Sequence, residues 1–157
     1  MFKRLTQFIG IVGIEVAVEI ETSTPKDATR IEGTIRIEAE QDQTINKIDI
    51  EMTQRMEEGS VGDSDRKIER KVIGTVTLHD AFTIKKGETK NIPFALDFKR
   101  ELSLTRKMAE QGGLMGMIGK AYTAADNERW QFWVEALVDV KGAAIDPTGS
   151  TQVFFGN

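Results

Sequence analysis

The chain has 157 residues, a formal net charge of −4 and no cysteine. This length is enough for one domain with a sizeable core, and 39% hydrophobic with 29% charged residues is typical of a soluble globular protein. The lack of cysteine excludes a disulfide framework, a thiolate metal site and a cysteine nucleophile. The negative charge argues against a dedicated nucleic-acid binder.

Segment 1–13 has apolar residues at helical spacing, which predicts a short amphipathic helix or turn. These residues are Phe2, Leu5, Ile9 and Val12. One interpretation is a segment docked on the domain's own core; the other is a membrane-surface or partner-docking segment, because Lys3 and Arg4 flank the apolar face. Glu15 and Glu19 interrupt the apolar run, so no signal peptide is expected. No stretch approaches the ~20 apolar residues of a membrane span. We therefore expect a cytoplasmic protein without stable membrane insertion.

Alternation of apolar and polar residues with period two predicts a series of short strands. They cover residues 14–20, 31–37, 48–52, 68–78, 82–84, 92–98, 130–140 and 153–155. Ile45 lies off the register of the third strand, which predicts a bulge there or a strand that starts late. Gly87 is expected to take a positive φ in the turn at 85–88. Pro93 cannot donate a ladder hydrogen bond, so its strand is expected at a sheet edge or bulged.

Residues 99–128 break this rhythm and predict a short helical insert between the last strands. Apolar residues recur at helical spacing from Leu104 to Tyr122, while glycines within the stretch predict a hinge between two short helices. We expect this insert to cover the outward-facing Trp133 and Leu137. Its methionines form an adaptable surface, so it is the candidate protein-interaction site. The candidate residues are Leu104, Met108, Met115, Met117, Ile118 and Tyr122.

Regularly spaced short strands joined by glycine, proline and aspartate turns predict one all-β domain over residues 1–157. The expected architecture is an antiparallel β-sandwich that carries the helical insert.

Three blocks of sequence resemble a known family. They are Gly33–Ile37 followed by Ile45–Ile50, then Phe82–Glu88 with Ile92–Phe94, then Trp133–Val140. In order and spacing these blocks resemble the N-terminal domain of arrestin-like proteins, and among these the bacterial sporulation-control family. The resemblance implies an immunoglobulin-like sandwich that acts as an adaptor or regulator through protein binding, with no catalytic residues. Arrestin-like chains usually carry two sandwiches in tandem, whereas this chain has one, and segment 99–128 replaces a short connection.

Other sites were considered and none is predicted. Residues 113–120 have the wrong glycine spacing for a phosphate-binding loop and an alanine where a magnesium-binding hydroxyl belongs. His79 and Asp80 lack a nucleophile in any recognisable motif. The acidic residues at 57–65 lack the spaced ligands of a calcium loop, and the basic residues at 66–71 lack interleaved aromatic residues for nucleic acid. We therefore expect no catalytic, metal or cofactor site.

The preferred hypothesis is a non-catalytic adaptor with a protein partner and no nucleic acid. A second hypothesis is a structural or assembly protein that forms homo-oligomers through an edge strand. An enzyme is the third hypothesis and has the least support.

Overall fold

The computed structural model describes residues 2–4, 7–8, 13–58, 67–100 and 129–156. The chain divides into two compact units. The first comprises Met1–Thr53, Val72–Lys99 and Phe132–Asn157, and the second comprises Gln54–Lys71 and Arg100–Gln131. The described parts of the second unit are the ends of three strands that begin or finish in the first.

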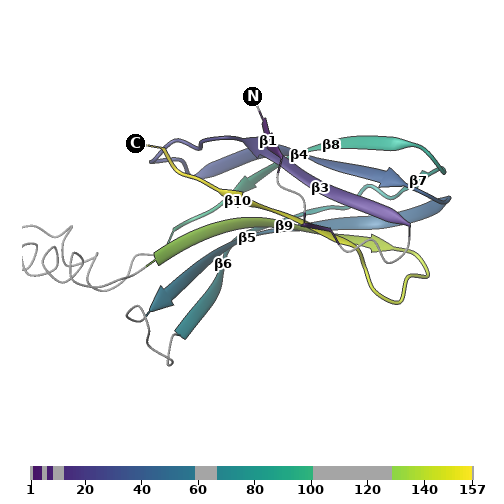
Figure 1. Ribbon diagram of the computed structural model, residues 1–157. Coiled ribbons are helices and arrows are strands. Elements are labelled where there is room, and N and C mark those ends of the chain that lie inside the picture. The colour runs from purple at the N-terminus through teal and green to yellow at the C-terminus, as the bar shows by residue number, and fades with distance from the viewer. Residues whose placement is uncertain (1, 5–6, 9–12, 59–66, 101–128, 157) are drawn as a thin grey trace, which may run out of the picture. The chain divides into compact units, whose positions relative to one another are not determined.

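The described residues form strands and turns without a helix. A four-stranded sheet has the order β1-β3-β4-β8, and a six-stranded sheet has the order β2-β10-β9-β5-β6, with β7 paired to β5 (Figure 1). The pairings are antiparallel. The first sheet contains β1 (Phe2–Arg4), β3 (Ile14–Glu21), β4 (Arg30–Ala39) and β8 (Thr89–Asp97). The second contains β2 (Gln7–Phe8), β5 (Gln43–Glu58), β6 (Lys67–Leu78), β7 (Phe82–Ile84), β9 (Arg129–Val140) and β10 (Thr148–Val153).

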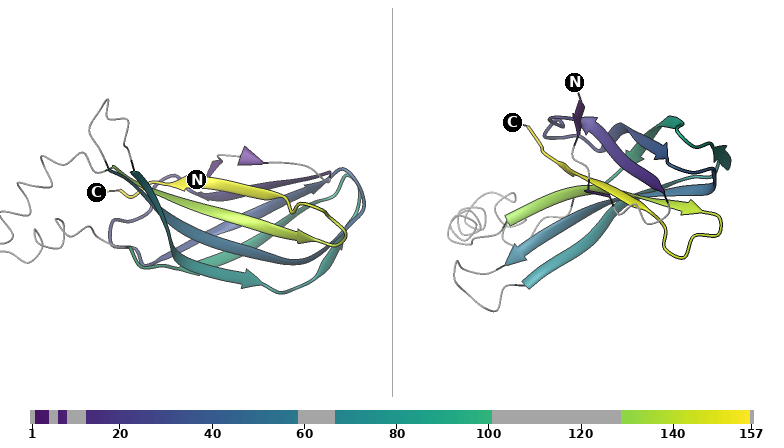
Figure 2. Two further views of the ribbon diagram at one scale, coloured as in Figure 1. Left: turned by 90° about the horizontal axis from the view of Figure 1, so that it is seen from below. Right: turned by 45° about the vertical axis from the view of Figure 1, so that its right-hand side comes forward.

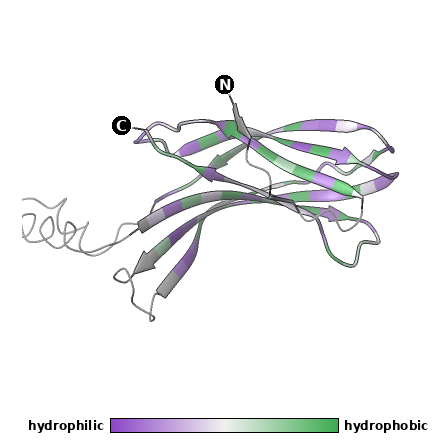
Figure 3. Ribbon diagram, in the orientation of Figure 1, coloured by the Kyte–Doolittle hydropathy of each residue, from purple (hydrophilic) through white to green (hydrophobic). Residues whose placement is uncertain are grey.

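The two sheets of the first unit share one hydrophobic core. Inward positions of their strands are filled mainly by isoleucine and valine, whose branched side chains suit a pleated surface. Apolar and polar residues alternate along each strand (Figure 3), and the two layers are visible from further directions in Figure 2. The fully buried side chains include Val16, Val18, Ile35, Ile37, Ile48, Ile50 and Leu96. The predicted inward parities of β3, β4 and β9 are confirmed.

Two glycines let the backbones of the sheets approach each other. A Cβ at Gly149 of β10 would lie 2.5 Å from the carbonyl oxygen of Val16 in β3, and a Cβ at Gly74 of β6 would overlap the carbonyl oxygen of Asp97 in β8. Next to the contact between Gly74 and Asp97, the Lys99 N–H donates a hydrogen bond to the Ile73 carbonyl oxygen (3.1 Å). The sheets therefore meet on both sides of the core at positions where no side chain fits.

The C-terminal segment ties the sheets together at one end of the core. The Thr24 N–H donates to the Phe154 carbonyl oxygen, and the Gly156 N–H donates to the Thr24 carbonyl oxygen, both at 2.8 Å. The Phe155 ring meets Phe132 edge-on, with centroids 4.9 Å apart, and Phe98 at 5.9 Å. Such tilted aromatic pairs add to the stabilisation from burial.

The helical prediction for segment 1–13 is wrong for the residues that the structure describes. Phe2–Arg4 pairs with Glu19–Glu21 of β3, and Gln7–Phe8 pairs with β10 at Gly149 and Ser150. Pairing with existing sheet edges satisfies backbone groups that an isolated short helix would leave partly unpaired. The segment thus adds one short strand to each sheet of its own domain.

The prediction from the sequence also starts the last strand too late and makes the third strand too short. β10 begins at Thr148 rather than at Val153, inside the predicted turn. β5 begins at Gln43, so the late start predicted from Ile45 is wrong; Ile45 is buried and pairs with Phe82 of β7. The predicted helical insert covers residues 99–128, of which 101–128 lie outside the described residues.

Two predictions about the stretch around β8 are confirmed. Gly87 has a φ of 81°, and β8 is the last strand of its sheet as described. Along the β4–β8 ladder, hydrogen-bonded residue pairs alternate with pairs that are not hydrogen-bonded. Two bonds show which pairs are which: the Ala39 N–H donates to the Glu88 carbonyl oxygen (3.1 Å), and the Phe98 N–H donates to the Thr29 carbonyl oxygen (2.9 Å). By this alternation Pro93 occupies a position whose nitrogen points away from β4, so no ladder bond is lost.

Replacing Gly149 with alanine should lower the free energy of unfolding by roughly 2 kcal/mol or more, because the added methyl group collides with the backbone of Val16. Urea denaturation measures this loss. Ser150→Ala, on the neighbouring half-buried position, is the control and should change stability by less than about 0.5 kcal/mol. Equal effects of the two substitutions would show that the sheets do not meet closely at Gly149.

Candidate functional site

The interaction residues predicted from the sequence all fall within 101–128, outside the described residues. They are Leu104, Met108, Met115, Met117, Ile118 and Tyr122. Leu137, which the insert was expected to cover, has an exposed fraction of 41%. The hollows described below all lie in the first unit.

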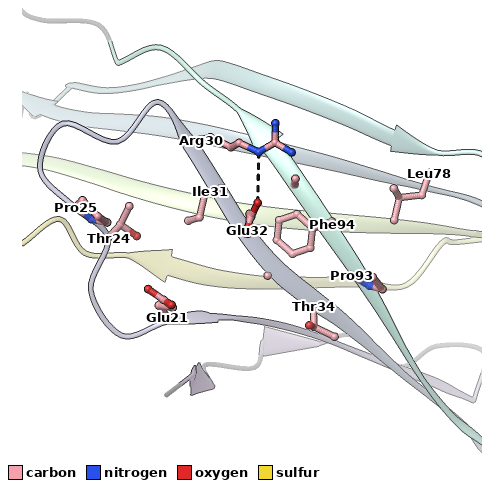
Figure 4. A pocket seen from close by; sticks show the side chains of 12 residues that line it. Glu21, Thr24, Pro25, Arg30, Ile31, Glu32, Thr34, Leu78, Pro93 and Phe94 are labelled. Atoms are coloured by element: carbon pink, nitrogen blue, oxygen red, sulfur yellow. Dashed lines mark ion pairs between the residues drawn. The ribbon is translucent and has the colours of Figure 1, made fainter.

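A hollow of the first unit with a volume of about 810 Å³ lies over β4 and β8 (Figure 4). We call it the β4–β8 groove. Its lining residues come from the end of β3 and the loop after it, from β4 and β8, and from the end of β6. The lining includes Glu21, Pro25, Arg30, Glu32, Thr34, Leu78, Pro93 and Ala95.

Arg30 is the cation of the β4–β8 groove, and carboxylates on both sides neutralise it. Its guanidinium lies 3.6 Å from Glu32 and 3.7 Å from Asp97. All three side chains are more than half exposed, so these ion pairs are screened by water and contribute little to stability. Glu21 has no ion-pair partner among the described residues. The groove therefore carries an excess of negative charge.

The apolar part of the β4–β8 groove is preformed. Ile31 and Phe94 line it from below and are only 4% and 5% exposed, so the core holds them in place. Pro25 and Pro93 have fixed φ angles and give up little conformational entropy when a ligand binds. A floor of this kind can accept apolar side chains without rearrangement of the sheet.

The outward face of the six-stranded sheet carries a smaller hollow of about 330 Å³ beside Asp49, Thr77 and Leu137. The Thr77 hydroxyl donates a hydrogen bond of 2.7 Å to the Asp49 carboxylate, and the Lys47 ammonium lies 3.4 Å from the same carboxylate. The hydrogen bond from Thr77, helped by the charge of Lys47, holds the pKa of Asp49 below its ordinary value.

A third hollow of about 410 Å³ lies where β5 and β7 begin to pair. It is lined by exposed lysines, Lys85 and Lys141, and by Asp42. Asp42 accepts a hydrogen bond of 2.8 Å from the Lys86 backbone N–H. The aspartate thus joins the turn before β5 to the turn before β8, and the two lysine side chains are exposed.

His79 and Asp80 lie exposed beyond the end of β6. Within the described ranges, no three histidine, aspartate or glutamate side chains come together in a way that could hold a metal ion. Asp63 and Asp65 lie outside the described residues. The described part of the chain also holds no helix with the length and apolar character needed to span a bilayer.

Sequence reasoning missed the β4–β8 groove. The outward parity of Glu32 and Thr34 was visible in the alternation, but nothing in the sequence placed Pro93 opposite Thr34 or the loop at Pro25 beside them. A groove formed by neighbouring strands is decided by sheet order, which periodicity within one strand does not reveal.

Comparison with known proteins gives a family model and a solved structure that each match most of the chain. The family model described as SpoOM protein (Spo0M) matches residues 2–153. Comparison with curated protein sequences finds no match. The crystal structure of Spo0M, a sporulation control protein from Bacillus subtilis, matches with a TM-score of 0.61 and 19% sequence identity. That match covers 94% of this chain and 51% of the solved chain, so this chain spans about half the length of that relative. At this identity the likeness establishes the fold.

Replacing Thr77 with valine should raise the pKa of Asp49 toward its ordinary range, because the carboxylate loses the hydrogen bond that most lowers it. A carboxylate with a lowered pKa in the folded state stabilises the protein above its unfolded-state pKa, and this contribution is lost as the pH falls through the folded-state pKa. Thr77→Val should therefore weaken the acid dependence of stability below about pH 5.

Nuclear magnetic resonance titration of the Asp49 carboxyl carbon measures the shift in pKa directly. Thr75→Val, an exposed position two residues away on β6, should leave the titration unchanged. An unaltered Asp49 pKa in Thr77→Val would contradict the assigned cause.

Proposed function

This chain belongs to the SpoOM (Spo0M) family, whose model matches residues 2–153, and we propose that it is a non-catalytic regulatory protein that acts by binding another protein. The observation that carries this proposal is the family match over nearly the whole chain, together with the fold shared with a sporulation control protein. Because the chain spans about half of that relative, its role in sporulation and the identity of its partner are part of the proposal.

The architecture supports an adaptor role. Two antiparallel sheets with one shared core agree with the immunoglobulin-like, arrestin-like sandwich that the sequence blocks suggested. In such a domain the inward positions serve the core, and the outward faces, edges and loops are free to contact partners. We place the protein in the bacterial cytoplasm, in agreement with its composition and lack of cysteine.

Binding rather than catalysis agrees with the chemistry of the described surfaces. The single histidine of the chain is exposed. The β4–β8 groove presents carboxylates, a guanidinium and apolar side chains, with no nucleophile beside a general base. Such a lining suits recognition of a peptide or protein surface.

Self-association through an edge strand was the alternative function. Pro93 opposes it at β8, because its nitrogen points to the open edge in the middle of the strand and offers no hydrogen-bond donor there. At the other side of the core, β6 already approaches β8 at Gly74 and Asp97. We therefore favour binding of a different protein over assembly of identical copies.

To test the proposed function, the chain carrying an affinity tag is used to capture proteins from cells that produce it, and each captured protein is then purified. A stable complex of fixed stoichiometry in size-exclusion chromatography, without covalent change to either protein by mass spectrometry, is the expected result. A chain that forms no complex with any purified candidate, or that turns over substrates in a hydrolase screen, would overturn the proposal.

Replacing Pro93 with valine should promote self-association, because it restores a donor to the open edge of β8. Sedimentation velocity over a wide range of concentrations should show a monomer for the unaltered chain and larger species for Pro93→Val. The stability cost should stay below about 1 kcal/mol, since no native ladder bond changes. Pro25→Ser, which removes a proline from a loop, is the control and should remain monomeric. Self-association of the unaltered chain would instead favour the assembly function.

A further inference from the structure

We propose that the β4–β8 groove binds an extended, positively charged segment of the partner protein, with an apolar side chain of that segment seated against Pro93 and Leu78. This inference rests on the proposed function, because it names the site and the chemistry of the partner. Nothing in the resemblance or in the family match assigns a partner to this surface.

The size and lining of the groove suit a peptide segment. Its volume of about 810 Å³ falls at the upper end of the range for ligand sites and exceeds what one side chain fills. Figure 4 shows Pro25 at one end of the groove and Leu78 and Pro93 at the other, with the charged residues Glu21, Arg30 and Glu32 between them. An extended chain that carries both apolar and charged side chains presents matching chemistry along such a surface.

The charge of the surrounding sheet face selects a cation. Along β3, β4 and β8 the outward positions hold many more carboxylates than guanidinium groups. The carboxylates are Glu15, Glu19, Glu21, Glu32, Glu38 and Asp97, and the guanidinium groups are Arg30 and Arg36. Both arginines are already occupied by neighbouring carboxylates, Arg30 by Glu32 and Asp97, and Arg36 by Glu38 at 3.5 Å.

The register of β3 and β4 brings two like charges together, and a cationic partner would reduce their repulsion. Glu15 of β3 lies directly opposite Glu38 of β4, and like charges at opposed positions are destabilising. A carboxylate-rich or phosphate-rich partner would increase this repulsion, whereas a basic segment would reduce it. The surface therefore discriminates against nucleic acid and acidic peptides.

The chain itself already places a basic strand beside this face. β1 carries Lys3 and Arg4 and pairs with the outer edge of β3, with Arg4 in register opposite Glu19. This pairing shows that an extended basic segment is accepted along the acidic sheet at one edge. The β4–β8 groove lies on the neighbouring strands of the same sheet and reaches the end of β3 at Glu21. Glu21 lies in register opposite Phe2 of β1 and has no ion-pair partner among the described residues.

The test uses the full chain and a short peptide of alternating lysine and valine, blocked at both ends. Matched peptides with glutamine or glutamate in place of lysine are the probe controls. We expect chemical-shift changes in β4, β8 and the loop at Pro25 with the lysine peptide, weaker changes with the glutamine peptide, and none with the glutamate peptide. Shifts confined to other surfaces of the chain would overturn the proposal.

Charge variants locate the binding and separate it from attraction by net charge. The double substitution Glu21→Gln with Glu32→Gln should weaken binding about tenfold, whereas Arg30→Gln should tighten it, because it removes the only cation lining the groove among the described residues. Glu51→Gln with Glu135→Gln, on the six-stranded sheet, makes the same change in net charge and should have little effect. If the two double variants weakened peptide binding equally, or if Arg30→Gln left the affinity for the peptide unchanged, the groove would not be the binding site. Thermal unfolding confirms that each variant is folded.

A purified partner from the capture experiment distinguishes failure of this inference from failure of the proposed function. A partner bound equally by the unaltered chain and by Glu21→Gln with Glu32→Gln would overturn the groove and leave the binding function standing. The absence of any complex would contradict the binding function itself. A complex that forms with the unaltered chain and is lost only in Glu21→Gln with Glu32→Gln supports both the binding function and the groove as its site.

Discussion

The fold depends on two places where the sheets touch through backbone rather than side chains. Gly149 of β10 lies against the carbonyl of Val16, and Gly74 of β6 lies against the carbonyl of Asp97. Between these two lines of contact the inward isoleucines and valines fill the interior, and close packing of branched side chains holds the layers at a fixed separation. A larger side chain at either glycine would force the sheets apart along that side and loosen the packing of the whole core.

Because the core is built from inward positions, the outward positions can carry charge without placing it in the core. On the four-stranded sheet this freedom produces a face dominated by glutamate, with Arg30 and Arg36 held by adjacent carboxylates. On the six-stranded sheet the comparable positions hold threonine and isolated acids such as Asp49, whose charge is satisfied by Thr77 and Lys47. The two faces differ in what they offer to a partner: one has an unbalanced charge beside a groove, and on the other the acid beside the hollow, Asp49, already has partners.

The strands that periodicity located correctly are those with a regular apolar side. β3, β4 and β9 place isoleucine or valine at most inward positions, so alternation indicated both their extent and their buried face. The start of β10 was missed because its first inward residues, Gly149 and Thr151, are small or polar, and only Val153 at its end is a buried apolar residue. They are small because β10 crosses β3 at close range, which is a property of the assembled sheets. The short strands β1 and β2 escaped for a related reason: their pairing partners, not their own sequence, make them strands.

The sequence by itself therefore determined an all-β chain, the inward faces of its main strands, the turn at Gly87 and the edge position of the strand that carries Pro93. It also suggested the sporulation-control family, to which the family model over residues 2–153 assigns the chain. Only the tertiary structure decided which strands are neighbours, because pairing depends on long-range backbone hydrogen bonds that leave no periodic trace. That decision brings Glu21, Arg30 and Pro93, which are far apart in sequence, to one groove. It is also what makes a surface for a partner out of residues that individually look like ordinary solvent-facing positions.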